Sequence, residues 1–104
     1  MIIDLILEIR KFNSDRNWDG DHSPKNLAMS VMIESAELAE HFQWLTELES
    51  YEPKSINKVS DEVADVFIYL LNLCDKLHID PEKAIRHKLT VNAKRFVSKE
   101  GGGQ

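Results

Sequence analysis

The 104-residue sequence is poor in the features that mark secreted, membrane-spanning or nucleic-acid-binding proteins. Its single cysteine, Cys74, excludes an intrachain disulfide and fits a reducing compartment, so we expect a cytoplasmic protein. Asp4 and Glu8 interrupt the apolar N-terminal stretch MIIDLILEIR, which argues against a signal peptide or a membrane span. Acidic residues outnumber basic ones by 18 to 13, so we expect no nucleic-acid partner.

Alternating patterns typical of β-strands are also missing, and apolar residues recur instead at helical spacing. Pro24 and Pro81 each suit a first helical turn, with Ser23 and Asp80 as the N-caps. We therefore predict an all-α, four-helix-bundle-type fold with two long central antiparallel helices. The expected domain is 1–98, followed by a flexible tail at 99–104, and the expected helices are 2–13, 24–48, 55–77 and 81–96.

The predicted second helix carries acidic residues beside its apolar stripe. With about 100° per residue, Glu34 lies at the edge of this stripe, and Glu37 follows it by one helical turn. Glu40 points away, toward solvent. The stripe itself consists of Leu27, Val31, Leu38, Phe42 and Leu45.

The predicted third helix repeats this arrangement, with a polar stripe beside an apolar one. Its polar stripe follows the spacing i, i+3, i+7 and i+10, and comprises Glu62, Asp65, Tyr69 and Asn72. Two long helices joined by a short linker pack antiparallel, so the acidic pairs of both helices should face one another. Its apolar stripe comprises Val59, Val63, Val66, Phe67, Leu70, Cys74 and Leu77.

Four carboxylates in one place repel each other, and a cation between them would relieve this repulsion. Oxygen ligands without cysteine favour a hard cation, Mg²⁺ or as a substitute Mn²⁺, over zinc. Mg²⁺ commonly bridges protein carboxylates to substrate phosphates. The acids thus predict a metal site for a phosphorylated substrate.

The stretches ESAELAEHFQW and DEVADVFIYLLNL resemble the MazG-like, all-α nucleoside triphosphate pyrophosphohydrolases. The family signature, ExxE followed by ExxD, reads here Glu34-Ser-Ala-Glu37, then 24 residues, then Glu62-Val-Ala-Asp65. The segments RNW, HSPKNL and KLTVNAKRF extend the similarity toward the dCTP pyrophosphatase branch, in order and spacing.

This resemblance implies Mg²⁺-dependent hydrolysis of an NTP or dNTP between the α- and β-phosphates, with dCTP favoured. Glu34, Glu37, Glu62 and Asp65 match the metal ligands of the family. One carboxylate could instead hold or deprotonate the attacking water, and Glu37, beside Glu34, is our hypothesis for that catalytic role. The family assembles as dimers or tetramers, so we expect a homo-oligomer, with a tetramer favoured over a dimer.

Several further residues are candidates for contacts to the nucleotide. Trp18 and Trp44 resemble aromatic residues that surround the base, and packing in a core or a subunit interface is an equal alternative. Tyr69, one turn after Asp65, could lie under the sugar and exclude a 2′-hydroxyl. The remaining candidates are Asn92, which resembles a family asparagine, its helix-face neighbours Lys88 and Arg95, and the weaker candidates His22 and Lys25.

Two other interpretations of the acidic cluster remain. A di-iron carboxylate bundle requires Glu-x-x-His on two helices, whereas the nearest match here is a lone Asp75-Lys-Leu-His78. A non-catalytic helical regulatory or interaction module could keep the acids as an ion-binding staple. Such a staple would need only the acids, so the aromatic residues and Asn92 favour the enzyme.

Overall fold

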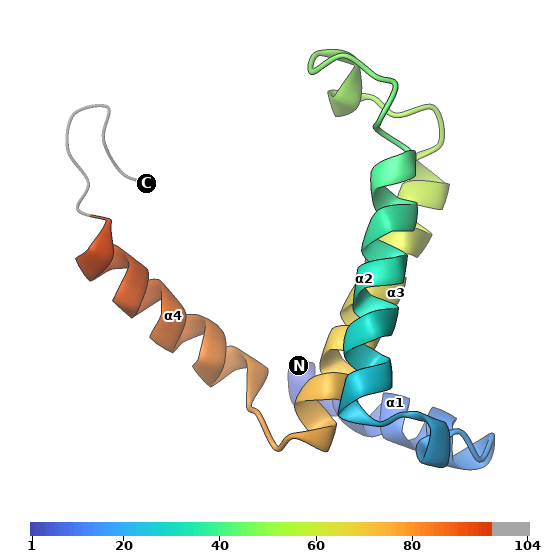
Figure 1. The fold of residues 1–104 in the computed structure, drawn as a ribbon, viewed down its shortest axis with the longest axis vertical. Coiled ribbons are helices and arrows are strands. Elements are labelled where there is room, and N and C mark those ends of the chain that lie inside the picture. Colours follow the sequence, from blue (N-terminus) through green and yellow to red (C-terminus); the bar gives the residue numbers. More distant parts are fainter. Residues whose placement is uncertain (97–104) are drawn as a thin grey trace.

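A computed structural model describes residues 1–96 of the chain and shows an all-helical fold, as predicted (Figure 1). No β-strand occurs within these residues. The predicted tail at 99–104 lies outside the described part. The α-helices are α1 (Ile2–Asp15), α2 (Pro24–Glu40), α3 (Ile56–Lys76) and α4 (Pro81–Arg95), with short 3₁₀ turns η1 (Asp19–Asp21) and η2 (Glu49–Tyr51).

The helix starts follow from local capping chemistry. Ser23 Oγ accepts a hydrogen bond from the backbone N–H of Asn26 at 3.2 Å, at the start of α2. Asp80 Oδ1 accepts one from the backbone N–H of Lys83 at 3.1 Å, at the start of α4. Each cap satisfies a backbone donor that the helix leaves without a partner. Both predicted N-caps are confirmed.

The end of α2 differs from the prediction, because the helix stops at Glu40 and not at residue 48. Thr46 and Glu49 explain the early end. The Thr46 N–H donates to Glu49 Oε1 at 2.9 Å, and the Glu49 N–H donates to Thr46 Oγ1 at 3.1 Å. This reciprocal capping box starts a new helical turn at η2, so the chain between Glu40 and Thr46 closes into tight turns.

The packed part of the molecule consists of α1, α2 and α3. Figure 1 shows α2 and α3 side by side and antiparallel, with α1 across their lower end. Leu27 of α2 is 1% exposed, and Ile6 of α1 and Val59 of α3 are also buried. Arg10 of α1 donates two hydrogen bonds to Asp75 of α3, at 2.7 and 3.2 Å. The predicted antiparallel pair is therefore the centre of the fold.

Helix α4 leaves this packed body. His78 adopts a left-handed φ of 56°, and the Ile79 N–H donates to Cys74 O at 2.8 Å, which forms a Schellman-type end to α3. The chain then runs outward, and α4 lies apart from the other helices (Figure 1). The radius of gyration is 16.8 Å, against about 13 Å for a compact domain of this length.

Much apolar surface stays uncovered in the single chain. The chain exposes 8497 Å², whereas a folded monomer of 12.0 kDa exposes about 6,000 Å². On α3 the predicted apolar stripe is only partly buried, since Phe67 is 60% exposed. Within residues 1–96, no helix combines the length and the apolar character needed to cross a membrane.

Replacement of Leu27 by alanine should destabilise the fold, because Leu27 is the most deeply buried large side chain of the described core. We expect the free energy of unfolding to fall by about 2–4 kcal/mol, as measured by urea titration. Leu48→Ala is the matched control, since Leu48 is 82% exposed, and it should change that free energy by about 0.5 kcal/mol or less. Equal effects of the two substitutions would contradict this location of the core.

Candidate metal and nucleotide site

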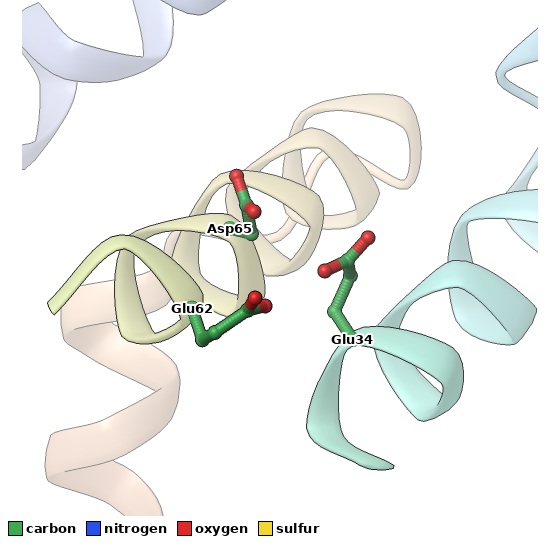
Figure 2. Close-up of side chains that lie close together, drawn as sticks. All are labelled: Glu34, Glu62 and Asp65. Carbon is green, nitrogen blue, oxygen red and sulfur yellow. The ribbon is translucent and has the colours of Figure 1, made fainter. Parts of the chain in front are cut away.

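Three carboxylates from the two central helices converge on one point. Glu34 projects from α2, and Glu62 and Asp65 project from α3 toward it (Figure 2). One oxygen from each of the three lies within 4.8 Å of the other two. The i, i+3 spacing puts Glu62 and Asp65 on one face of α3, and the antiparallel packing brings Glu34 opposite them.

The described residues do not neutralise the charges of this cluster. Ion pairs within residues 1–96 involve none of its three acids. Glu62 Oε2 is buried and has no hydrogen-bond partner there. A buried carboxylate oxygen without a partner is costly, so this atom is suited to ligation of a cation.

Glu37 lies one turn after Glu34 and is exposed at the edge of the cluster. A side-chain hydrogen bond between these two carboxyls raises the pKa of Glu34 from 4.5 to about 7, and partial burial and nearby negative charges add to the shift. Without a cation, Glu34 therefore holds a proton through much of the range below neutral pH.

The donor set fits a hard divalent cation. All three converging groups offer carboxylate oxygen, and neither a cysteine nor a histidine belongs to the cluster. Oxygen ligands of this kind suit Mg²⁺ and Mn²⁺, which prefer them to sulfur or imidazole. Of the four acids named as metal ligands from the sequence, three thus converge, and Glu37 is not among the converging groups.

A cleft of about 570 Å³ opens between α1, α3 and the residues that flank η1, and none of the three acids lines it. Trp18, His22 and Tyr69, three of the predicted substrate contacts, line it together with Phe12 and Phe67. The rings of Trp18 and Phe12 meet edge to face at 5.5 Å, and Trp18 and His22 lie 6.2 Å apart. Flat aromatic walls of this kind can stack a nucleobase.

Other predicted contacts lie elsewhere in the chain. Lys25 is exposed in the first turn of α2. Trp44 is 87% exposed in the turns after α2 and is not among the lining residues of the cleft. The remaining three, Lys88, Asn92 and Arg95, are on α4, which lies apart from α2 and α3 (Figure 1).

Sequence reasoning missed two polar residues that line the cleft, Glu8 and Asn13, of which Asn13 is buried. Its side chain is 4% exposed and hydrogen-bonds Asn72, which was placed on the polar stripe of α3 without a role. Asn13 follows Ile9 by four residues and the buried Ile6 by seven, so a polar residue on the apolar stripe of α1 was the available signal. Only the packing of α1 on α3 gives it a place in the site.

The described residues form an all-α fold with a carboxylate cluster between two antiparallel helices and an aromatic cleft against α3. A family model described as MazG-like matches residues 29–103. The chain belongs to the MazG-like family, as its ExxE and ExxD motifs predicted.

Similar proteins agree with this assignment. The chain is 34% identical to rat dCTP pyrophosphatase 1 and 33% identical to the human protein of that name, over 83% of its own length in each case. It spans about half the length of these curated relatives, 53%. The crystal structure of a pyrophosphatase from Archaeoglobus fulgidus is also similar: it is 41% identical, with a TM-score of 0.88, and the match covers 91% of each chain.

Cation binding should release a proton from the cluster at pH 6 and little at pH 8. The reason is that Glu34, with its pKa raised to about 7, is protonated at the lower pH and ionised at the higher one. Calorimetric Mg²⁺ titrations in buffers of different ionisation enthalpy measure the released protons. Glu34→Gln should abolish the difference between the two pH values.

The same shift predicts how metal-free protein responds to pH. Since the pKa of Glu34 is higher in the folded state, its contribution to the free energy of unfolding falls from about pH 4.5 to pH 7. Wild type in EDTA should lose more stability over this range than Glu34→Gln. Identical pH profiles would contradict the raised pKa.

Proposed function

We propose that this protein is a Mg²⁺-dependent nucleoside triphosphate pyrophosphohydrolase that releases a nucleoside monophosphate and pyrophosphate. The observation that carries the proposal is that α3 contributes residues both to the acid cluster and to the aromatic cleft. Asp65 belongs to the cluster, and Tyr69, one helical turn further along α3, lines the cleft. A nucleotide can thus place its phosphates at the acids and its base between the aromatic rings.

The names of the relatives support this activity, since they are called dCTP pyrophosphatase and pyrophosphatase. We infer from the same names a preference for deoxynucleotides, with dCTP favoured. Tyr69 supplies a physical reason for such a preference, because its ring beside the sugar would crowd a 2′-hydroxyl. The single cysteine fits a cytoplasmic location, which we propose with it.

Glu34, Glu62 and Asp65 would hold the metal ion, with Glu37 at the edge of the same site. Bound Mg²⁺ neutralises triphosphate charge, polarises a phosphoryl oxygen and lowers the pKa of water. Glu37 is exposed and outside the three converging ligands, so its carboxylate is free to accept the proton of the attacking water.

Incubation with a panel of NTPs and dNTPs plus Mg²⁺ tests this function. We expect pyrophosphate and monophosphate as products, and Glu34→Gln and Glu37→Gln should each lower kcat by about 100-fold or more. Glu37→Gln should keep most of the Mg²⁺ affinity, since three ligands remain. Glu40→Gln is the matched control on α2, and it should retain activity because Glu40 is exposed and outside the cluster.

Three results would count against the assignment. Turnover that survives Glu37→Gln but not Glu34→Gln would remove Glu37 from its role as the base. Orthophosphate in place of pyrophosphate would overturn cleavage between the α- and β-phosphates. No product from any nucleotide would favour a non-catalytic helical module with a divalent-ion site.

We also propose that the protein works as a homo-oligomer, with a tetramer favoured over a dimer. The uncovered apolar surface and the isolated α4 support assembly, because both need a partner to be buried. Lys88, Asn92 and Arg95 on α4 would then contact the phosphates or base at the acid cluster of a neighbouring subunit. A single chain cannot bring these groups together in the arrangement that Figure 1 shows.

Mixing two inactive variants tests this contribution of α4. Glu62→Gln removes a metal ligand, and Lys88→Ala removes a phosphate contact. If α4 serves a partner's site, subunits of the two variants refolded together should regain about a quarter of wild-type activity, since one site in four combines both intact parts. Each variant refolded alone is the control. No recovery in mixtures shown by mass spectrometry to contain hybrids would contradict sharing between subunits.

A further inference from the structure

Asn13 and Asn72 form a buried polar pair at the cleft. Asn13, near the end of α1, is 4% exposed, and Asn72 of α3 is 5% exposed. The Asn13 Nδ2 donates to Asn72 Oδ1 at 2.6 Å. They are the two buried polar residues of the described core, and both line the cleft.

The backbone fixes which way both amides point. Asn72 Nδ2 donates to the carbonyl oxygen of Ile68 at 3.0 Å, and a carbonyl can only accept. Asn72 Oδ1 must therefore face Asn13, which must present its Nδ2 in return. Rotation of the Asn13 amide by half a turn would place two acceptors in contact. The Asn13 Oδ1 is thus held away from Asn72.

This Oδ1 is available to a ligand. No side-chain or backbone donor within residues 1–96 bonds to it. The buried polar side-chain atoms without a hydrogen-bond partner there are His22 Nδ1 and Glu62 Oε2, and the Asn13 Oδ1 is not among them. It therefore keeps accessible surface at the cleft, which Asn13 lines. The Asn13 backbone oxygen accepts a hydrogen bond from the Trp18 N–H at 3.0 Å. This bond fixes the position of Asn13 relative to Trp18, which also lines the cleft.

The acceptor also lies at a suitable place relative to the acids. Asp65, Tyr69 and Asn72 follow one face of α3, and seven residues of helix advance about 10 Å. A nucleotide with its phosphates at Asp65 and its sugar beside Tyr69 would direct the base edge toward the asparagine pair.

We propose that Asn13, oriented by Asn72, selects nucleotides whose base carries an exocyclic amino group. The amino group would donate to Asn13 Oδ1, whereas a keto oxygen at that place would meet a second acceptor and lose its hydrogen bond to water. Cytosine is accepted in this way and uracil is rejected. This inference rests on the proposed function for the placement of the nucleotide, and it assigns base choice to a residue of α1.

The test measures binding and not turnover. Isothermal calorimetry with the full chain and Mg²⁺ compares dCMP with dUMP, which differ in the amino or keto group and in the adjacent ring nitrogen. We expect dCMP to bind about tenfold or more tightly. In the double variant Asn13→Leu/Asn72→Leu the ratio should fall to about one. Because both polar partners are replaced together, no buried amide is left unsatisfied and the fold should be kept.

Asn72→Leu alone tests the orientation. It keeps Asn13 but removes the contact that holds its amide, so dUMP should bind more tightly than to wild type and the ratio should fall. A merely structural role for Asn72 would weaken both ligands equally. Asn57→Leu on the exposed part of α3 is the matched control and should leave the ratio unchanged.

Equal binding of dCMP and dUMP by wild type, an unchanged ratio in the double variant, or no binding of either ligand would each overturn the proposal. The last result would mean that something else, such as a second copy of the chain, fills the cleft. Failure of the proposed function looks different. Tight, Asn13-dependent dCMP binding without hydrolysis of any triphosphate would leave base selection standing and remove the enzymatic activity.

Discussion

Repulsion between carboxylates on α2 and α3 is the constraint on which the rest of the site depends. The packing that buries Leu27 and Val59 also brings Glu34 to Glu62 and Asp65. The hydrophobic contact between the helices therefore holds together charges that would otherwise separate. Protonation of Glu34 relieves part of this repulsion, and a divalent cation would relieve more of it.

The balance between hydrophobic packing and carboxylate repulsion explains why the acid cluster lies between two helices and not on a loop. Helix α3 holds Glu62 and Asp65 at a fixed spacing, and the shared apolar contact sets their distance from Glu34 on α2. Binding of a cation would thus strengthen the α2–α3 pair, since ions stabilise the state that binds them. The same effect would stabilise the aromatic cleft, because Tyr69 and Asn72 lie on the same helix as Glu62 and Asp65.

The extent to which the sequence predicts this molecule depends on how local each feature is. Helix starts at Ser23 and Asp80 were predicted because a cap and a proline stand next to each other in the chain. The acids were predicted because helical periodicity and antiparallel packing suffice to place Glu34 opposite Glu62 and Asp65. The end of α2 was missed, although Thr46-x-x-Glu49 is a readable capping box, because apolar residues continue the helical pattern past it.

Features that depend on packing between distant segments were not predictable. Nothing local to Asn13 indicates its partner 59 residues away. The sequence of α4 also does not indicate that this helix lies apart from the others, since its N-cap and length are those of an ordinary helix. The direction of α4 is set by the left-handed turn at His78, a conformation usually taken by glycine.

Because the turn at His78 directs α4 away from the other helices, the helical order of α4 can depend on protein concentration. A helix of 15 residues with no packed face is marginally stable in water, so α4 depends on whatever surface comes to cover it. If that surface belongs to another copy, dilution would first unravel α4 and leave α1–α3 folded. The basic residues of α4 would then lose their helical order before the acid cluster between α2 and α3 comes apart. Secondary structure at one end would thereby report on assembly.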